Sequence, residues 1–208
     1  LQIEVATARN DKYDASSRKP SKIIYTNLEG DLSRRDFTIN AMAMDIGTKN
    51  FGQLFDPYKG IIDLQNKIIR TPLDPDETFS DDPLRMMRAA YFSSKLGFKI
   101  EPGCSESIRR QASRIKIVSA ERIRDEFIKI LQTPKPSLGL RILQKTGLME
   151  IVFPEIHIMY GMDQTKEWHH KDIFAHTLQV VDNAAKLSKK MELRFAALVH
   201  DIAKPKTR

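Results

Sequence analysis

Asp81-Asp82-Pro83-Leu84-Arg85-Met86-Met87-Arg88-Ala89-Ala90-Tyr91-Phe92 is the stretch at which the chain becomes helical. Its apolar residues recur at helical spacing and fall on one side: Leu84, Met87, Ala90 and Tyr91. This spacing predicts a helix that extends to about Leu96. The sequence that follows keeps the same helical character.

Polar residues of this stretch form a second pattern. Asp82, Arg85 and Arg88 recur at i, i+3 and i+6, which predicts one polar ridge along the helix. A carboxylate beside a guanidinium supplies an acceptor and a pair of donors that can match the edge of a nucleobase, and the next arginine can reach a phosphate. The alternative is an exposed ion-pair ladder worth about 0.2 to 0.5 kcal/mol.

The rest of the chain divides into three parts by its pattern. Residues 1–70 mix short β-like runs with turns, which predicts an α+β part, and the polar segment 9–22 is interpreted as a mobile surface loop. Helical periodicity and end signals predict further helices over residues 105–112, 119–131, 137–146, 172–187 and 192–203. We therefore predict domains at residues 1–70, 71–160 and 161–208, the last two all-α.

Composition and charge exclude several classes of protein. With 208 residues, 41% of them hydrophobic, the chain is too long and too apolar for a disulfide-stapled miniprotein or a disordered tail. Cys104 has no partner for an internal disulfide, and no apolar run approaches the roughly 18 residues of a membrane span. These features predict a cytoplasmic protein with no membrane contact. The net charge of +7 favours phosphate-rich partners.

A second polar cluster lies upstream, at Arg34-Arg35-Asp36-Phe37-Thr38-Ile39-Asn40. The planar fork of arginine donates two parallel hydrogen bonds and keeps its charge, so Arg34 and Arg35 suit phosphate oxygens. Asp36 and Asn40 have the chemistry to bind ribose hydroxyls. The alternative is a surface Arg–Asp pair that caps a helix, and these seven residues alone favour neither reading.

Several motifs occur in a fixed order: Arg34 to Ala41, the turn of Asp56, Pro57 and Gly60, then Asp81 and Asp82 followed by Arg85, and finally Ser119-Ala120-Glu121-Arg122-Ile123. Together they closely resemble the tRNA nucleotidyltransferase and poly(A) polymerase family, in the bacterial and eukaryotic class of the polymerase β superfamily. The resemblance covers residues 1 to about 160. It implies the α+β remainder of a polymerase β-like nucleotidyltransferase domain, followed by a helical neck and body.

The resemblance also implies an activity and roles for individual residues. Arg35 with Asp36 is expected to hold the phosphate and ribose of the incoming nucleotide, and Asp82 with Arg85 to pair with the base of ATP or CTP. The implied reaction is template-independent addition or repair of the 3′ CCA end of tRNA, with two Mg²⁺ ions. A bacterial poly(A) polymerase shares these motifs and stays open as an alternative.

Two features depart from the family pattern. The family's Asp-x-Asp pair, which holds the Mg²⁺ ions, has no counterpart here, so we expect an internal fragment that adds no nucleotides by itself. Glu4 falls where the family places a third catalytic carboxylate, and one carboxylate rarely holds catalytic Mg²⁺. Tyr91 stands where the family helix usually has another arginine, so phosphate affinity is expected to rest on Arg85 and Arg88.

Basic side chains on the predicted helices form a candidate RNA-binding surface. They are Arg109, Arg110, Arg114 and Lys116, with Arg122 and Arg124 further along the chain. A non-catalytic RNA-binding module is therefore a further alternative, which predicts salt-sensitive tRNA binding. Arg18-Lys19-Pro20, in the polar segment 9–22, suits a phosphate contact and a solvated loop equally well.

Histidines are concentrated near the carboxyl end of the chain. His169, His170, His176 and His200 lie there, and Asp201 directly follows His200. Two antiparallel helices would bring His176 to this His-Asp pair, and neutral imidazoles with a carboxylate suit a transition-metal ion that activates water against a phosphate ester. The alternative is a set of hydrogen-bonded core histidines.

This stretch resembles the start of an HD-type phosphohydrolase domain. The resemblance implies that His176, His200 and Asp201 are metal ligands, and that a last aspartate ligand lies beyond Arg208. His170 and Asp172 are expected to line the same cleft. A metal-dependent phosphohydrolase is thus an alternative function of another class, and neither its substrate nor the oligomeric state is readable from the sequence.

Overall fold

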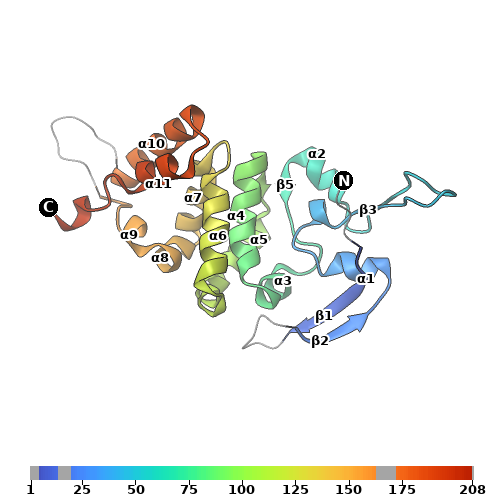
Figure 1. Cartoon of the computed structure of the whole chain (residues 1–208). Coiled ribbons are helices and arrows are strands. Elements are labelled where there is room, and N and C mark those ends of the chain that lie inside the picture. Colours follow the sequence, from blue (N-terminus) through green and yellow to red (C-terminus); the bar gives the residue numbers. More distant parts are fainter. Residues whose placement is uncertain (1–4, 14–19, 163–171, 208) are drawn as a thin grey trace.

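The computed structural model describes residues 5–13, 20–162 and 172–207. Figure 1 shows the strand-containing part at one end, a group of packed helices in the middle, and the last two long helices, α10 and α11, at the opposite end. The predicted order of an α+β part followed by helical parts is confirmed. The predicted domain boundaries stay a prediction.

The amino-terminal part contains short strands and helices. They are β1 (Arg9–Tyr13), β2 (Pro20–Tyr25), α1 (Leu28–Ser33), η1 (Thr38–Asn40), β3 (Ala43–Met44), β4 (Leu54–Phe55), α2 (Gly60–Asn66) and β5 (Ile68–Ile69). β1 pairs antiparallel with β2, and β3 with β4. β5 pairs in parallel with β6 (Lys99–Ile100), which ties this part to the helices.

The prediction of a mobile loop over residues 9–22 is wrong at both of its ends. β1 and β2 form an antiparallel ladder in which Arg9 is the partner of Tyr25. Backbone N–H and C=O groups make such a ladder, so polar side chains do not prevent it. Arg18 and Lys19 lie outside the described residues, and so does Glu4.

The helical parts contain most of the chain's regular structure. Their elements are α3 (Pro75–Asp81), α4 (Leu84–Leu96), α5 (Pro102–Gln111), η2 (Ala112–Ile117), α6 (Ala120–Leu131), α7 (Pro136–Lys145), α8 (Leu148–Val152), α9 (Pro154–His157), α10 (Ile173–Leu187), α11 (Met191–Val199) and η3 (Lys204–Lys206). The predicted ends of α4, α6, α7 and α10 are confirmed to within one residue. The prediction for the last helix is wrong at its end, because α11 stops at Val199 instead of residue 203. After Val199 the backbone bonds tighten to the i→i+3 type, with the Ile202 N–H donating to the Val199 carbonyl oxygen at 3.1 Å and the Lys204 N–H to that of Asp201 at 3.0 Å.

Helix α4 is the centre of the helical part and packs against α6 and α7. Its inner face is fully buried at Met86, Met87, Ala89 and Ala90. Gly139 lets α7 approach closely, because a Cβ there would lie 2.6 Å from Ile130 Cγ2 and 3.2 Å from the Ala90 carbonyl oxygen. This packing fixes the helix that carries Arg85 and Arg88.

Arg194 fastens α11 to the middle helices from a buried position. Its guanidinium donates to the carbonyl oxygens of Leu131 at 2.7 Å and Thr133 at 3.0 Å, where α6 ends. It also donates to the carbonyl oxygens of Ala185 and Ser188, where α10 ends. One hydrophobic cluster also runs from the amino-terminal part to α11.

Candidate functional site

A cleft of about 830 Å³ lies where the amino-terminal part meets α4 and α6. Its lining residues are Arg34, Arg35, Asp36, Asn40, Asp82, Leu84, Arg85, Arg88, Phe92, Arg122, Asp125, Glu126 and Lys129. All seven predicted nucleotide-binding residues are among them. Segments far apart in the sequence therefore meet at one site, rich in arginine and carboxylate groups.

Asp36 joins the amino-terminal part to α4. Its Oδ2 accepts hydrogen bonds from Arg88 Nε at 2.7 Å and Nη2 at 2.6 Å. Its Oδ1 accepts from the Phe37 N–H at 2.9 Å and from Asn40 Nδ2 at 3.1 Å. The carboxylate is almost completely buried, so Asp36 organises the cleft as well as lining it.

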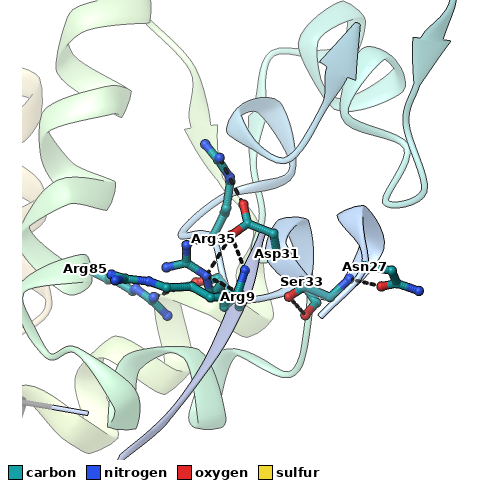
Figure 2. A network of polar contacts seen from close by, with 8 residues as sticks. Arg9, Asn27, Asp31, Ser33, Arg35 and Arg85 are labelled. Atoms are coloured by element: carbon teal, nitrogen blue, oxygen red, sulfur yellow. Dashed lines mark hydrogen bonds and ion pairs between the residues drawn. The ribbon is translucent and has the colours of Figure 1, made fainter. Parts of the chain in front are cut away.

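Asp31, which the sequence did not single out, holds the two predicted phosphate-binding arginines. Arg34 Nη2 lies 2.6 Å from Asp31 Oδ1 and Arg35 Nη2 lies 3.2 Å from Oδ2, and the Arg9 N–H donates to Oδ1 (Figure 2). Burial raises the pKa of the Asp31 carboxyl, but the hydrogen bonds from Arg34, Arg9 and Arg35 outweigh it and leave this pKa below its ordinary value. The spacing at i, i+3 and i+4 across the end of α1 was the available signal.

Arg85 bridges the two sides of the cleft through backbone carbonyls. Its Nη2 donates to the Arg34 carbonyl oxygen at 2.6 Å, and its Nη1 donates to that of Thr78 at 3.2 Å. The labelled sticks in Figure 2 show Arg85 reaching the group around Arg9 and Arg35. Arg85 thus fixes the peptide that carries Arg34.

The prediction that Asp82 lies on the same helical ridge as Arg85 and Arg88 is wrong. α4 begins at Leu84, and Asp82 has extended backbone (φ −139°, ψ 99°), since the residue before a proline is driven out of the α region. The Asp82 carboxylate is paired with Arg122 of α6, with Nη2–Oδ2 at 2.8 Å and Nη1–Oδ1 at 3.4 Å. Asp82 nevertheless lines the cleft with both ridge arginines.

Helix α6 contributes residues that the sequence analysis did not assign to nucleotide binding. Arg122, Glu126 and Lys129 recur at i, i+4 and i+7 and all line the cleft. Lys129 Nζ lies 2.9 Å from Glu126 Oε2. This helical stripe of charges was the signal that could have identified them.

Four of the predicted RNA-binding residues, Arg109, Arg110, Arg114 and Lys116, lie on α5 and η2 and do not line the cleft, whereas Arg122 of α6 lines it. Arg110 is paired with Asp76 at 2.8 Å, and Arg109 with Glu106 at 2.5 Å. Arg114 Nη2 donates to the Ser80 carbonyl oxygen at 3.0 Å. Lys116 is exposed at the end of η2. Except for Arg114, these cations face solvent and remain accessible to a partner.

His176 of α10 meets His200 and Asp201 just beyond α11. One ligand atom from each of the three residues lies within 4.8 Å of the other two. His200 Nε2 lies 3.3 Å from Asp201 Oδ2, and the two imidazole ring centres are 5.5 Å apart. Lys204 Nζ donates to the same Asp201 oxygen at 2.7 Å. Two imidazoles and a carboxylate at this spacing fit a transition-metal ion.

Asp172 is not part of this cluster, contrary to expectation. Its Oδ1 accepts from the Phe174 N–H at 2.7 Å, and its Oδ2 accepts from the Gly161 N–H at 2.9 Å. Asp172 therefore caps α10, as residues of its type do at helix starts. His170, the other residue expected here, lies outside the described residues.

Three protein-family models match the chain in sequence. They are the poly A polymerase head domain over residues 1–70, the probable RNA and SrmB-binding site of polymerase A over residues 97–159, and the HD domain over residues 173–208. The multifunctional CCA protein of Vibrio parahaemolyticus is 43% identical over 183 residues, which are 85% of this chain and 43% of that protein. The chain belongs to the tRNA nucleotidyltransferase and poly(A) polymerase family. It spans about half or less of the length of the curated relatives it matches.

Solved structures of this family share the fold. A CCA-adding enzyme in its apo form II superimposes with a TM-score of 0.72 at 25% identity, covering 96% of this chain and 45% of that one. A CCA-adding enzyme in complex with CTP gives a TM-score of 0.66 at 25% identity, covering 85% of this chain and 40% of that one. Within the described part of this family member, no helix is long and apolar enough to cross a membrane.

Proposed function

We propose that this chain carries the nucleotide- and RNA-binding core of a tRNA nucleotidyltransferase that adds or repairs the 3′ CCA end from CTP and ATP. The observation that supports this proposal most directly is the cleft. Three sequence segments, around residues 34–40, 82–92 and 122–129, contribute charged and polar side chains to one cavity of about 830 Å³. A similar fold with bound CTP is known in a CCA-adding enzyme.

Asp82 is proposed as the acceptor that chooses the base. Cytosine and adenine present an exocyclic amino donor, whereas uracil and guanine present a carbonyl oxygen at the equivalent edge. An ionised carboxylate only accepts hydrogen bonds, so it favours the two amino bases. In this proposal Arg85 is held in place by its hydrogen bonds to the carbonyl oxygens of Thr78 and Arg34. Its remaining N–H groups donate to the ring of the base.

The cations of the cleft are proposed to hold the nucleotide's phosphates. Arg34, Arg35 and Arg88 face the cavity from two sides, and each is already oriented by Asp31 or Asp36. Oriented guanidinium groups bind phosphate with less loss of side-chain entropy than free ones. Asn40, beside Asp36, is proposed to contact the ribose.

The proposal includes Mg²⁺ ions for nucleotidyl transfer and a separate metal ion at the histidine cluster. Two Mg²⁺ ions would supply the charge that activates the RNA 3′ hydroxyl and neutralises the leaving pyrophosphate. Glu4 is the proposed carboxylate ligand in this chain, and it lies outside the described residues. Within residues 5–13, 20–162 and 172–207, the one group of three or more candidate ligands is that of His176, His200 and Asp201, and none is at the cleft.

We propose tRNA as the RNA partner and the cytoplasm as the location of the protein. Arg109, Arg110 and Lys116 are exposed on the segment that matches the RNA-binding family model. Exposed cations bind the phosphate backbone without reading sequence, so their affinity falls steeply with salt. Poly(A) polymerase activity is the alternative that shares the cleft.

A metal-dependent phosphohydrolase is a second candidate function, favoured by the histidine cluster. A transition-metal ion bound there would lower the pKa of a water molecule and polarise a phosphate ester. His176, His200 and Asp201 would hold the ion, and Lys204 would have to leave Asp201 or share it. The substrate class proposed for this site is a phosphate ester.

Nucleotide binding by the chain tests the main proposal. Calorimetric titration should show tighter binding of CTP and ATP than of UTP and GTP, and Asp82→Ala should remove this preference while leaving weak phosphate-dependent binding. Equal affinity for all four nucleotides would contradict the proposal. Incorporation from CTP and ATP on a tRNA that lacks its 3′ end, by a full-length protein with these residues, separates CCA addition from poly(A) synthesis.

A further inference from the structure

Glu126 carries a buried carboxylate oxygen with no hydrogen-bond partner in the part of the chain that the structure describes. Its side chain is only 2% exposed, and Oε2 accepts from Lys129 Nζ. The other oxygen, Oε1, is shielded from solvent and unmatched. Buried polar atoms are normally paired, so such an atom at a ligand cleft points to a partner that arrives in another state.

Arg122 is placed to be that partner. It lies one helical turn before Glu126 on α6, and side chains at i and i+4 are neighbours on a helix surface. Its guanidinium now binds Asp82, with Nη2–Oδ2 at 2.8 Å. Both carboxylates line the same cleft, so Arg122 has two alternative acceptors and engages one of them.

The fork of Arg122 covers the edge of Asp82 that a base would use. Nη2 and Nη1 donate to Oδ2 and Oδ1, and Oδ1 also accepts the Leu84 N–H at 3.2 Å. A base amino group that approaches in the plane of the carboxylate meets the guanidinium first. Base binding and the Arg122 contact therefore compete for Asp82.

We propose that Arg122 is a positioning residue that alternates between Asp82 and Glu126. The inference rests on the proposed function, in which Asp82 accepts the amino group of cytosine or adenine. When such a base donates to Asp82, Arg122 moves to Oε1 of Glu126 and pairs the unmatched oxygen. A base with a carbonyl at that edge offers Asp82 no donor and leaves Arg122 in place. A ligand shifts the equilibrium between two states only if it binds one of them more tightly. Cytosine and adenine favour the state with Arg122 on Glu126 and the other bases do not, so the exchange adds to the discrimination between amino and carbonyl bases.

The test is a double-mutant cycle on nucleotide binding. Glu126→Gln should weaken binding of CTP and ATP about fivefold, because a neutral amide holds a guanidinium less well than a carboxylate does. UTP binding should not change. In an Arg122→Met background the same Glu126→Gln change should alter CTP binding by less than about twofold, since the group that moves is gone.

Matched variants separate the exchange from other roles of Glu126. Glu121→Gln removes a charge from the exposed side of the same helix and should leave all four affinities unchanged. Lys129→Gln removes the other partner of Glu126 and should affect CTP and UTP alike. An equal loss on Glu126→Gln with and without Arg122 overturns the inference, and so does an unchanged CTP affinity.

Failure of the proposed function has a different signature. It appears as no preference for CTP and ATP in the unaltered chain, or as a preference that Asp82→Asn does not change. If Glu126→Gln does not fold, the Nε–H resonance of Arg122 in the unaltered chain provides the test. It should shift on addition of CTP but not of UTP, and no shift with CTP overturns the inference.

Discussion

The arginine-rich cleft and the histidine cluster are both lined by charged side chains, but they are assembled over different distances along the chain. The cleft pairs Asp36 with Arg88, 52 residues away, and Asp82 with Arg122, 40 residues away. In the cluster, His200 and Asp201 are adjacent, Lys204 is three residues further, and only His176 comes from another helix. The cleft therefore depends on how the parts of the chain pack, while the cluster is mostly local.

Burial separates the carboxylates of the two sites from the imidazole of His200 and does not separate one site from the other. The side chains of Asp36 and Asp201 are 9% and 10% exposed, whereas that of His200 is 34% exposed. Removing one partner of a buried ion pair leaves a charge without compensation, but removing an exposed one costs little. Asp36 and Asp201 are thus expected to stabilise the fold, whereas the more exposed His200 is expected to act mainly in ligand binding.

Asp36→Ala should have the largest effect on stability. It leaves the Arg88 guanidinium and the Asn40 amide without their shared acceptor, so the free energy of unfolding should fall by about 3 kcal/mol. Urea denaturation followed by circular dichroism measures this change. Asp125→Ala is the control, because Asp125 also lines the cleft but pairs with its exposed neighbour Arg124. It should cost less than about 1 kcal/mol, and equal costs would remove the distinction between the two kinds of pair.

Lys204→Met should change metal binding at the histidine cluster. Lys204 Nζ competes with a metal ion for Asp201 Oδ2, so its removal should raise the affinity for Mn²⁺ up to about fivefold, the equivalent of one exposed ion pair. Isothermal titration with Mn²⁺ measures the affinity.

Two comparison variants bracket this result. Lys206→Met removes an equal charge two residues away and should have a smaller effect, while His200→Ala should abolish binding. A lower Mn²⁺ affinity in Lys204→Met would mean that the lysine supports the site instead of competing for it.

Local signals in the sequence predicted α4, α6, α7 and α10 to within one residue, but α5 begins at Pro102 instead of residue 105, and the short helices α3, α8 and α9 were not predicted. Gly147, with φ of +80°, stops the turn after α7, and Asp172 caps α10 through its own side chain. The end of α11 was predicted wrongly because an α-helix and the tighter turns that follow it here have similar sequence patterns. The hairpin of β1 and β2 was missed since backbone pairing leaves little trace in polar side chains.

The members of the cleft were predictable, but their pairing was not. The motif around Arg35 and the one around Asp82 supplied the right residues, and the structure brings them together. The expected partnership of Asp82 with Arg85 assumed that both lie on one helix, and Pro83 prevents this. The partner that the structure gives Asp82, Arg122, comes from a packed helix, and a single sequence carries no signal for such a contact.

Asp31 lies near the cleft but pairs with Arg34 and Arg35, which are only three and four residues away. Its substitution by asparagine should have the smallest effect on stability. Its folded-state pKa is lowered, so it contributes stability above its ordinary value of 3.8 and loses that contribution as the pH falls below it. Asp31→Asn should therefore lower the free energy of unfolding near neutral pH by less than about 1 kcal/mol, because asparagine has a similar shape and keeps one oxygen that can accept hydrogen bonds from Arg34 or Arg35. The difference from the unaltered chain should shrink as the pH approaches about 2.

Urea titrations across this pH range measure the difference, and Glu29→Gln, on the same helix, serves as the charge-matched control. A difference that stays constant with pH would show that Asp31 acts through its shape and not through its charge. In that case the arginines at the mouth of the cleft would be positioned by packing, and the contrast between a cleft organised by ion pairs and a local cluster would hold for Asp36 and Asp82 alone.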